Sequence, residues 1–380
     1  MDDAARKTMN RRDFLKGAVA LGAALGAAPI LCGAEAARPR AAAQNASPAN
    51  SLENGALPRR TLGRGDAAFE VSALGFGCMG LNYHRGAHPD KKAAIRLVRE
   101  AAERGVTLFD TAESYGPHTN ELLVGEALNE CGDGVFATSK FGHKFVNGRR
   151  VMSEEDSSPS NIRKVCEESL RRLGAEAIGI FYQHRADPNT PVEVVAETVK
   201  ELIREGKVLH FGLCEVNADT IRRAHAVCPV TAVQSEYHLM WRAPEKSVLP
   251  VCEELGIGFV PYSPLNRGFL GGDLTEYVRF DGRNVNRPSL PRFAPDAIRA
   301  NLRIVQVLHD FGRTRGITSS QIALAWLLHR SPRIVPIPGT TKLSHLEENL
   351  RALDVRFAPD EIAELEAFVS EIPIRGSRYE

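Results

Sequence analysis

From residue 57 onward, short apolar runs alternate with longer segments in which apolar residues recur at helical spacing. Strands that each lead into a helix form a parallel sheet, and eight such strands fit a closed barrel better than an open sheet. The alternation therefore predicts an α/β fold of the (β/α)8 TIM-barrel class. The expected strands are 71–77, 106–110, 135–140, 178–184, 210–214, 232–234, 258–262 and 333–338. The helices expected between them include 91–104, 161–173, 192–205, 218–227, 245–255 and 320–329.

The main alternative, an open doubly wound sheet, is disfavoured by the end of the first predicted strand. Such a sheet is expected to carry G-x-G-x-x-G between an early strand and its helix. This chain has Gly75-Phe-Gly-Cys-Met-Gly80 there, with the wrong spacing and no helix directly after it. Residues 60–70 are predicted to form a hairpin that closes the floor of the barrel. The Gly-, Pro- and Arg-rich segment 266–295 is the one long loop and is a candidate lid.

Composition limits the kinds of partner and site. The 380 residues are 43% hydrophobic and 25% charged, with a formal net charge of +1, which is ordinary for a globular protein with one large domain. The sequence has no basic patch beyond the N-terminus, so nucleic-acid binding is not expected. The seven cysteines include no CxxC or CxxxC pair, so neither a disulfide framework nor a metal site is expected.

The N-terminal residues have a different character. Asn10-Arg-Arg-Asp-Phe-Leu-Lys16 precedes an apolar run, 17–31, and then Ala34-Glu-Ala36. This order resembles a twin-arginine (Tat) export signal with its cleavage site. The apolar run of 15 residues is shorter than the about 20 that a membrane span needs. The alternative is a disordered or interfacial N-terminal helix.

This reading divides the chain into a signal peptide (1–37), a flexible linker (38–56) and a barrel domain (57–380). The Tat translocon would then be a partner, and the location would be the periplasm or cell envelope. Without use of the signal, the protein would stay in the cytoplasm. Export by this route suits a protein that folds around a cofactor before it crosses the membrane.

Four chemically active side chains follow three consecutive predicted strands. Asp110 ends the second strand and Tyr115 lies in the loop after it, while Lys140 and His184 end the third and fourth. Barrel enzymes place their chemistry at this end of the strands. A tyrosine, with an ordinary pKa of about 10, donates a proton usefully only near a cation. We expect Lys140 to lower the pKa of Tyr115, with Asp110 holding the lysine charged.

These residues sit in motifs that resemble the aldo-keto reductases, in order from about residue 59 to residue 372. The resemblance implies a barrel with an additional C-terminal helix that binds NADP(H) in extended form. It also implies a catalytic tetrad of Asp110, Tyr115, Lys140 and His184, with Tyr115 as the general acid when a carbonyl group is reduced. The motifs are Phe109-Asp-Thr-Ala-Glu-Ser-Tyr115, Ser139-Lys140-Phe141, Tyr182-Gln-His184, Gln234, Tyr262-Ser-Pro-Leu265 and Ile337-Pro-Gly-Thr-Thr-Lys-Leu-Ser-His-Leu-Glu-Glu-Asn349.

The same resemblance implies the cofactor contacts. Gln234 would hold the carboxamide, Tyr262 would stack on the nicotinamide, and the segment after Tyr262 would wrap the pyrophosphate. The segment 339–342 would meet the adenosine 2′-phosphate. The full set is Cys214, Glu215, Gln234, Tyr262, Ser263, Leu265, Arg267, Gly268, Gly339, Thr340, Lys342, Glu348 and Asn349.

Two departures from the family pattern bear on this set. Cys214-Glu215 replaces the Ser-Asn pair of many members, and a carboxylate cannot donate a hydrogen bond to a carboxamide oxygen. Between residues 334 and 350 the phosphate segment has no arginine and offers Lys342 and His345. Lysine is a point charge rather than a bidentate fork. NADP(H) is still favoured over NAD(H).

The expected activity is reduction of a small aldehyde or ketone, with the substrate set by the loops 83–90, 144–158, 239–244 and 266–291. One alternative is a cofactor-bound sensing or binding module with little turnover. Another is a barrel isomerase or lyase that uses Lys140 as a Schiff base. The latter leaves Gln234, Tyr262 and Lys342 unexplained.

Overall fold

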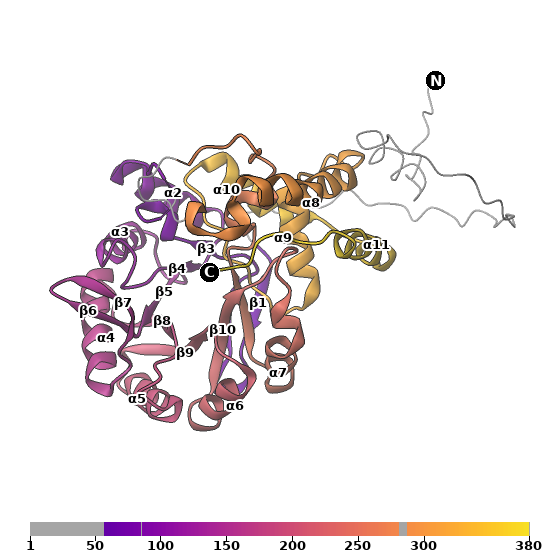
Figure 1. The fold of residues 1–380 in the computed structure, drawn as a ribbon. Helices are drawn as coiled ribbons and strands as arrows, with labels where there is room; N and C mark the ends of the chain where they lie inside the picture. The colour runs from indigo at the N-terminus through magenta and orange to yellow at the C-terminus, as the bar shows by residue number, and fades with distance from the viewer. Residues whose placement is uncertain (1–56, 85, 281–286, 380) are drawn as a thin grey trace, which may run out of the picture. The chain divides into compact units, whose positions relative to one another are not determined.

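The computed structural model describes residues 57–84, 86–280 and 287–379, so the predicted signal peptide and linker lie outside the described residues. Parallel strands form a barrel wall ringed by helices (Figure 1). The wall contains a 7-stranded sheet in the order β11-β10-β9-β8-β5-β4-β3. These strands are β3 (Phe76–Gly77), β4 (Leu108–Asp110), β5 (Phe136–Phe141), β8 (Ile178–Gln183), β9 (Val208–Cys214), β10 (Val230–Glu236) and β11 (Gly258–Tyr262).

The eighth position in the wall is taken by the segment 333–338, where the eighth strand was expected. It carries Pro336 and Pro338, which have no N–H to donate, so regular strand pairing is interrupted. The remaining backbone groups still join the segment to β11 on one side and to β3 on the other. The bonds run from Val335 N to Phe259 O (2.9 Å), Ile337 N to Pro261 O (3.2 Å), Gly75 N to Pro336 O (2.9 Å) and Gly77 N to Pro338 O (3.1 Å). The predicted (β/α)8 barrel is confirmed.

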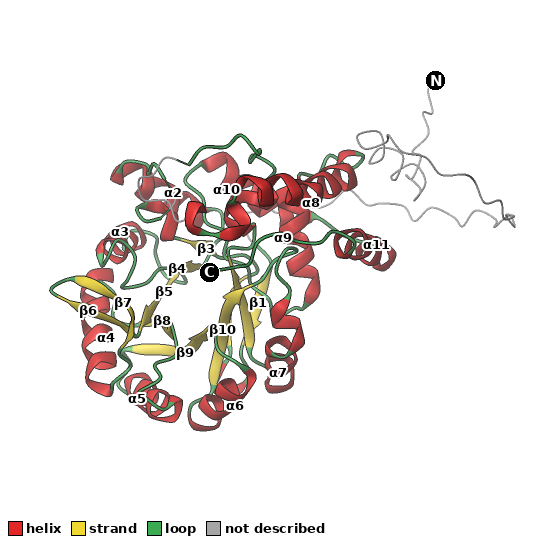
Figure 2. Cartoon of the chain, viewed as in Figure 1, coloured by secondary structure: helices red, strands yellow, loops and turns green. Residues whose placement is uncertain are grey.

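Helices cover the outside of the strands (Figure 2). Most of them are amphipathic, with apolar faces that join the strands in the main hydrophobic core, whereas the helix Ser319–Arg330 is buried along nearly its whole length. The side chain of Asp90 caps α2, and Thr318 and Gln321 form a capping box on α9. The helices are α2 (Lys91–Glu103), α3 (Thr119–Leu128), α4 (Pro159–Leu173), α5 (Val192–Arg204), α6 (Ala218–Val227), α7 (Val248–Leu255), α8 (Pro295–Arg313), α9 (Ser319–Arg330), α10 (Leu343–Leu350) and α11 (Pro359–Ser370).

A second apolar cluster fills the barrel interior, and the N-terminal hairpin closes it. Strands β1 (Arg59–Leu62) and β2 (Phe69–Ser72) pair antiparallel. Leu62 and Phe69 from this hairpin pack with inward-facing residues such as Ile180. A Cβ at position 258 would come within 2.3 Å of the Leu62 side chain, which explains a glycine at the start of β11. The predicted floor hairpin is thus present, and the apolar plug leaves the opposite rim for chemistry.

Some local predictions were wrong. The expected strand 71–77 is two strands, β2 and β3, because the chain leaves the hairpin before it enters the wall. The loop expected at 144–158 contains most of a hairpin made of β6 (His143–Val146) and β7 (Arg149–Glu155). The candidate lid 266–295 stays a prediction, and its first residues form a tight turn in which Phe269 and Leu270 are buried. Residues 281–286 of that lid lie outside the described residues.

The helix α11 is the predicted additional C-terminal helix. The chain then crosses the barrel mouth, as the yellow end of the ribbon shows (Figure 1). Asn301 of α8 anchors this tail through both side-chain atoms, which bond the backbone O and N of Arg375, each at 2.9 Å. Within the described part of the chain, no helix has the length and apolar character needed to cross a membrane.

Candidate active site

A buried ion pair lies at the carboxyl ends of β4 and β5. The ammonium nitrogen of Lys140 is 2.6 Å from Oδ1 of Asp110, and it also donates to the backbone oxygen of Thr111 at 2.7 Å. Lys140 is 0% and Asp110 4% exposed. Burial alone would lower the pKa of Lys140, but the neighbouring carboxylate outweighs burial and the pKa is raised. The lysine is therefore a fixed cation.

The second oxygen of Asp110 is held as firmly as the first. Oδ2 accepts from the Thr138 hydroxyl at 2.9 Å and from the Gln234 amide nitrogen at 2.8 Å. These two donors come from β5 and β10, on either side of the barrel interior. Because buried charges are stable only when paired and hydrogen-bonded, Asp110 is locked in one orientation. It serves as the anchor of the predicted tetrad.

Tyr115 lies over this ion pair, with its ring centroid 5.0 Å from the Lys140 ammonium nitrogen. Burial raises the pKa of Tyr115, the charge of Lys140 lowers it and Asp110 raises it, and the net result is a raised pKa. The lysine acts in the predicted direction, but the predicted net lowering is wrong because burial outweighs it. The phenol is consequently protonated at neutral pH and holds a proton to donate, and the charge of Lys140 offsets part of the loss of acidity that burial causes.

His184 follows β8 and faces Tyr115 edge-on, with the ring centroids 6.0 Å apart. Its backbone N–H donates to Phe141 O at 2.8 Å, and its Nδ1 lies 3.4 Å from the Ser114 hydroxyl. Burial, followed by the charges of His143 and other nearby cations, holds the pKa of His184 well below its usual range. The imidazole is therefore neutral at pH 7, with one nitrogen able to donate a hydrogen bond.

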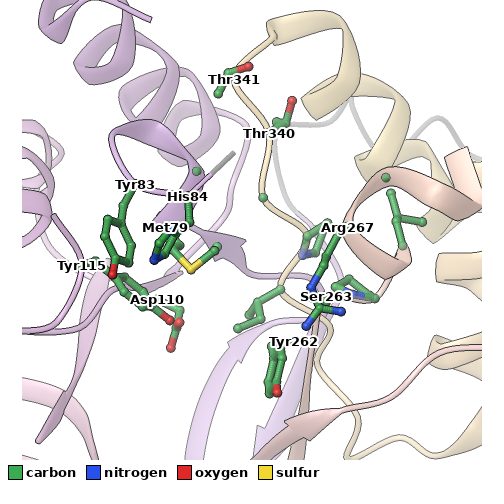
Figure 3. A pocket seen from close by; sticks show the side chains of 18 of the residues that line it. Met79, Tyr83, His84, Asp110, Tyr115, Tyr262, Ser263, Arg267, Thr340 and Thr341 are labelled. Atoms are coloured by element: carbon green, nitrogen blue, oxygen red, sulfur yellow. The ribbon is translucent and has the colours of Figure 1, made fainter. Parts of the chain in front are cut away.

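A single cavity of about 640 Å³ runs from Tyr115 and His184 to the segment 340–342. In Figure 3, Asp110, Tyr115 and Tyr83 gather on one side of it, while Tyr262, Ser263 and Arg267 lie across from them. A volume of this size is typical of cofactor and substrate sites. The predicted residues that line it are Asp110, Tyr115, His184, Gln234, Tyr262, Ser263, Leu265, Arg267, Gly268, Gly339, Thr340, Lys342, Glu348 and Asn349.

Three predicted residues are not part of the lining. Lys140 lies behind Asp110 and Tyr115, as its paired role requires. Cys214 packs inside the barrel, where burial raises the pKa of its thiol to about 12. Glu215 turns away and pairs with an arginine from the tail. Cys214 and Glu215 therefore lie beside the cavity, next to Gln234 and Tyr262, but do not line it.

That arginine, Arg378, joins the ends of three barrel strands. Its guanidinium donates to Glu215 Oε2 and to Glu236 Oε2, each at 2.8 Å, and it also donates to the hydroxyl of Tyr262. The next residue, Tyr379, places its hydroxyl 3.2 Å from that of Tyr262. The tail therefore holds the hydroxyl of Tyr262 by hydrogen bonds, in a network that the sequence analysis did not anticipate.

Glu236 is the buried centre of a wider network. Its two oxygens accept from the two terminal nitrogens of Arg267, each at 3.1 Å. Arg292 adds a third contact at 3.4 Å. Burial would raise the pKa of Glu236, yet His238 and Arg267 hold it far below its ordinary value. This arrangement fixes Arg267 against the cavity wall.

The turn after β11 has a strained backbone. Ser263, Asn266, Arg267 and Gly268 have positive φ angles of 49°, 46°, 56° and 90°. Three of these residues have side chains, so the conformation is costly and has to be maintained by packing. Hydrogen bonds within the turn help to maintain it, since Asn266 N donates to Ser263 O at 2.7 Å and Gly268 N to Leu265 O at 3.0 Å. With Arg267, Arg287 and Lys342 on the same cavity, the residues present fit a dinucleotide phosphate group.

The sequence analysis missed other lining residues, although some fall in loops it associated with substrate choice. Arg287 lies in the loop 266–291, His84 in 83–90 and Arg150 in 144–158, but no motif marks them. Further lining residues that it did not single out are Met79, Tyr83, Arg185, Ser320 and Tyr379, whereas Thr341 belongs to the predicted segment 339–342. Among the described side chains, no three of His, Cys, Asp or Glu gather as a metal site would require.

Comparison with known proteins decides the family. The family model described as "Aldo/keto reductase family" matches residues 73–370. The chain belongs to the aldo/keto reductase family. Its members are oxidoreductases that use nicotinamide cofactors. A "Probable aldo-keto reductase 1" from Glycine max is 41% identical over 321 residues, covering 83% of this chain and 90% of that protein.

Two solved structures share the fold. A glycerol dehydrogenase from Gluconobacter oxydans matches with a TM-score of 0.75 and 24% identity, over 82% of this chain and 96% of that one. An aldo/keto reductase from Klebsiella pneumoniae, in complex with NADP and acetate, matches with a TM-score of 0.64 and 24% identity, over 84% and 99% of the two chains. A twin-arginine translocation signal model matches residues 8–28, which agrees with the N-terminal prediction.

The ion pair predicts a large stability effect. Lys140→Met leaves the Asp110 carboxylate buried without its cation, so we expect the free energy of unfolding to fall by about 3–5 kcal/mol. Urea titration with a circular dichroism readout measures it. Adding Asp110→Leu to Lys140→Met removes the orphaned charge, so the double variant loses less than the sum of the single variants.

Arg163→Met is the control, because Arg163 forms exposed ion pairs with Glu201 and Glu205 on the outer surface. It is expected to cost less than about 1 kcal/mol. Equal losses for Lys140→Met and Arg163→Met would contradict the assigned role of the buried pair.

Proposed function

We propose that this chain is an NADP(H)-dependent reductase of small aldehydes or ketones, with Tyr115 as the proton donor. The observation that carries the proposal is the fixed cation of Lys140 beneath a protonated phenol, at one end of a cavity that reaches Lys342. The complete tetrad favours turnover over a purely sensing or binding role. The lysine is also fully engaged with Asp110 and Thr111, which disfavours a Schiff-base reaction.

Tyr115, Lys140 and His184 each have a separate role in the proposed reaction. When bound, the nicotinamide cofactor supplies a hydride to the carbonyl carbon. Tyr115 donates its phenolic proton to the carbonyl oxygen, so that the product is an alcohol. Lys140 stabilises the phenolate that remains until solvent returns the proton. Neutral His184 donates a hydrogen bond to the same oxygen and fixes its position.

The cofactor assignment follows the lining of the cavity. Gln234 and Tyr262 lie near the tetrad and would hold the nicotinamide end. The turn with Ser263, Leu265, Arg267 and Gly268 would hold the pyrophosphate. The adenosine and its 2′-phosphate would bind to the remaining predicted contacts, which are Gly339, Thr340, Lys342, Glu348 and Asn349. Lys342 is the cation of this last group, and it supports NADP(H) over NAD(H).

Replacement of Tyr115 tests the proton donor. Tyr115→Phe removes the proton and keeps the ring, so we expect kcat with an aldehyde panel to fall by about 100-fold or more. The dissociation constant for NADPH, measured by fluorescence titration, should stay unchanged.

Tyr83→Phe is the comparison, because this second phenol stacks on Tyr115 with a centroid distance of 6.0 Å. Its effect on kcat should be at least about tenfold smaller than that of Tyr115→Phe. Comparable losses in the two variants would refute the assignment. Tight NADPH binding by the unmodified protein without any turnover would favour the sensing role.

Replacement of Lys342 tests the cofactor preference. Lys342→Met is expected to weaken NADPH binding about tenfold, because one charge-assisted phosphate contact is worth about 1.5 kcal/mol or more. NADH binding should change little, since NADH lacks the 2′-phosphate. Lys92→Met, which removes an exposed lysine on α2 away from the cavity, is the control. A protein that binds NADH as tightly as NADPH would contradict the preference.

We further propose export to the periplasm or cell envelope in folded form through the Tat translocon. NADPH is not regenerated there by cytoplasmic metabolism, so the exported protein has to retain its cofactor. Fractionation of cells that express the full chain should place it outside the cytoplasm. Arg11→Lys/Arg12→Lys should leave it inside. A cytoplasmic location for both proteins would exclude export.

A further inference from the structure

The end of the cavity beside the tetrad carries an excess of positive charge. Two arginines line it, Arg150 from β7 and Arg185 directly after His184. The other lining cations, Arg267, Arg287 and Lys342, belong to the proposed cofactor end. The described lining carboxylates are Asp110, which Lys140 neutralises, and Asp273 and Glu348.

Arg185 has no carboxylate of its own. Among the described residues, no acidic side chain lies within ion-pair distance of its guanidinium. Its guanidinium donates a hydrogen bond from Nη1 to the backbone oxygen of His184, at 2.6 Å. The charge of Glu215 does act on Arg185, but both oxygens of Glu215 are already taken by Arg378, at 2.5 and 2.8 Å. Arg185 therefore presents an uncompensated cation to the cavity.

Arg150 is only weakly compensated. Its nearest carboxylate oxygen, Oε1 of Glu155, is 3.6 Å from its Nη2. The other oxygen of Glu155 lies 2.5 Å from Nδ1 of His143, so the carboxylate is shared. The Nε atom of Arg150 is buried and has no hydrogen-bond partner in the described structure. A buried donor without a partner costs free energy that a ligand can recover.

The charges of the Arg150 and Arg185 guanidinium groups both act on His184 and His143. Both charges help to hold the pKa of His184 low, and each also acts on the pKa of His143. Arg185 in turn lowers the pKa of Arg150, so the two cations repel each other. Like charges on one cavity wall are stable when an anion lies between them. Guanidinium forks match oxyanions in geometry as well as in charge.

We propose that the carbonyl substrate carries an oxyanion, a carboxylate or a phosphate, that binds Arg150 and Arg185 while the carbonyl group faces Tyr115 and His184. This inference rests on the proposed reductase function and names its substrate class. Binding by the remote anion orients the carbonyl group before proton transfer. Neutral carbonyl compounds of the same shape lack that contact and are poorer substrates.

Matched substrate pairs test the proposal in the holoenzyme. One pair is 4-carboxybenzaldehyde and methyl 4-formylbenzoate, and the other is glyceraldehyde 3-phosphate and glyceraldehyde. In at least one pair, KM for the anion should be about tenfold or more below that of its neutral partner. The pair with the larger ratio identifies carboxylate or phosphate. The ratio should shrink between about 0.05 and 0.5 M salt.

Variants assign the effect to the two arginines. Arg185→Gln and Arg150→Gln should each lower kcat/KM for the preferred anion by about 10- to 100-fold, with a much smaller loss for the neutral partner. Arg163→Gln, on the outer surface, should change neither. Equal losses for both members of a pair would show a structural role only and overturn the proposal. A KM ratio near one in both unmodified pairs would also overturn it.

A binding readout separates this proposal from the reductase assignment. Benzoate, which cannot be reduced, should raise the melting temperature of the holoprotein, whereas benzamide should not. Arg185→Gln should abolish the benzoate shift. Absence of turnover with every compound would refute the proposed function, and the benzoate shift would still decide on the anion site. Equal shifts of the melting temperature with benzoate and benzamide would overturn the anion site. The absence of a shift with both benzoate and inorganic phosphate would overturn it as well.

Discussion

An ammonium group and a carboxylate, removed from water and 2.6 Å apart, connect the chemistry of this protein to its fold. Lys140 and Asp110 come from neighbouring strands, and Gln234 reaches Asp110 from across the barrel interior. A buried charge tolerates little displacement, because each lost contact exposes it to an apolar surrounding. The barrel therefore holds the cation at a constant place beneath Tyr115. The parts of the site that we expect to set the substrate can then lie in loops.

The sequence analysis correctly placed those residues and segments whose position in the fold follows from a local sequence pattern. Asp110, Lys140 and His184 lie at or directly after the ends of predicted strands, and parallel barrel strands bring such residues to one rim. The segment 333–338 was also placed correctly, although its prolines interrupt regular pairing. In both cases the apolar pattern and the chain order suffice. The wall needs an eighth strand whatever its residues are.

The parts that were missed depend on contacts between distant segments or on the balance of opposing effects. No local pattern shows that Arg378 reaches Glu215, because the two are 163 residues apart. Glu215 is engaged with the tail and does not line the cavity, so its contact with the cofactor stays a prediction. The net pKa of Tyr115 was mispredicted because the sequence shows the lysine but not the depth of burial. The sequence analysis predicted a loop where the hairpin β6–β7 brings Arg150 to the cavity. The alternation of apolar and polar residues in these two strands is weak.

The position of Arg378 in the chain has a consequence for the order of events during synthesis. Its partners Glu215 and Glu236 are made 163 and 142 residues earlier. Before residue 378 is in place, Glu215 lacks its arginine and Tyr262 lacks a hydrogen bond, whereas Glu236 already has Arg267 as its cation. The wall of the cavity at Tyr262 is therefore completed by a residue that the ribosome adds 116 positions after Tyr262 itself. A barrel whose strands have already paired still has to wait for this segment before that part of the site has its final hydrogen bonds.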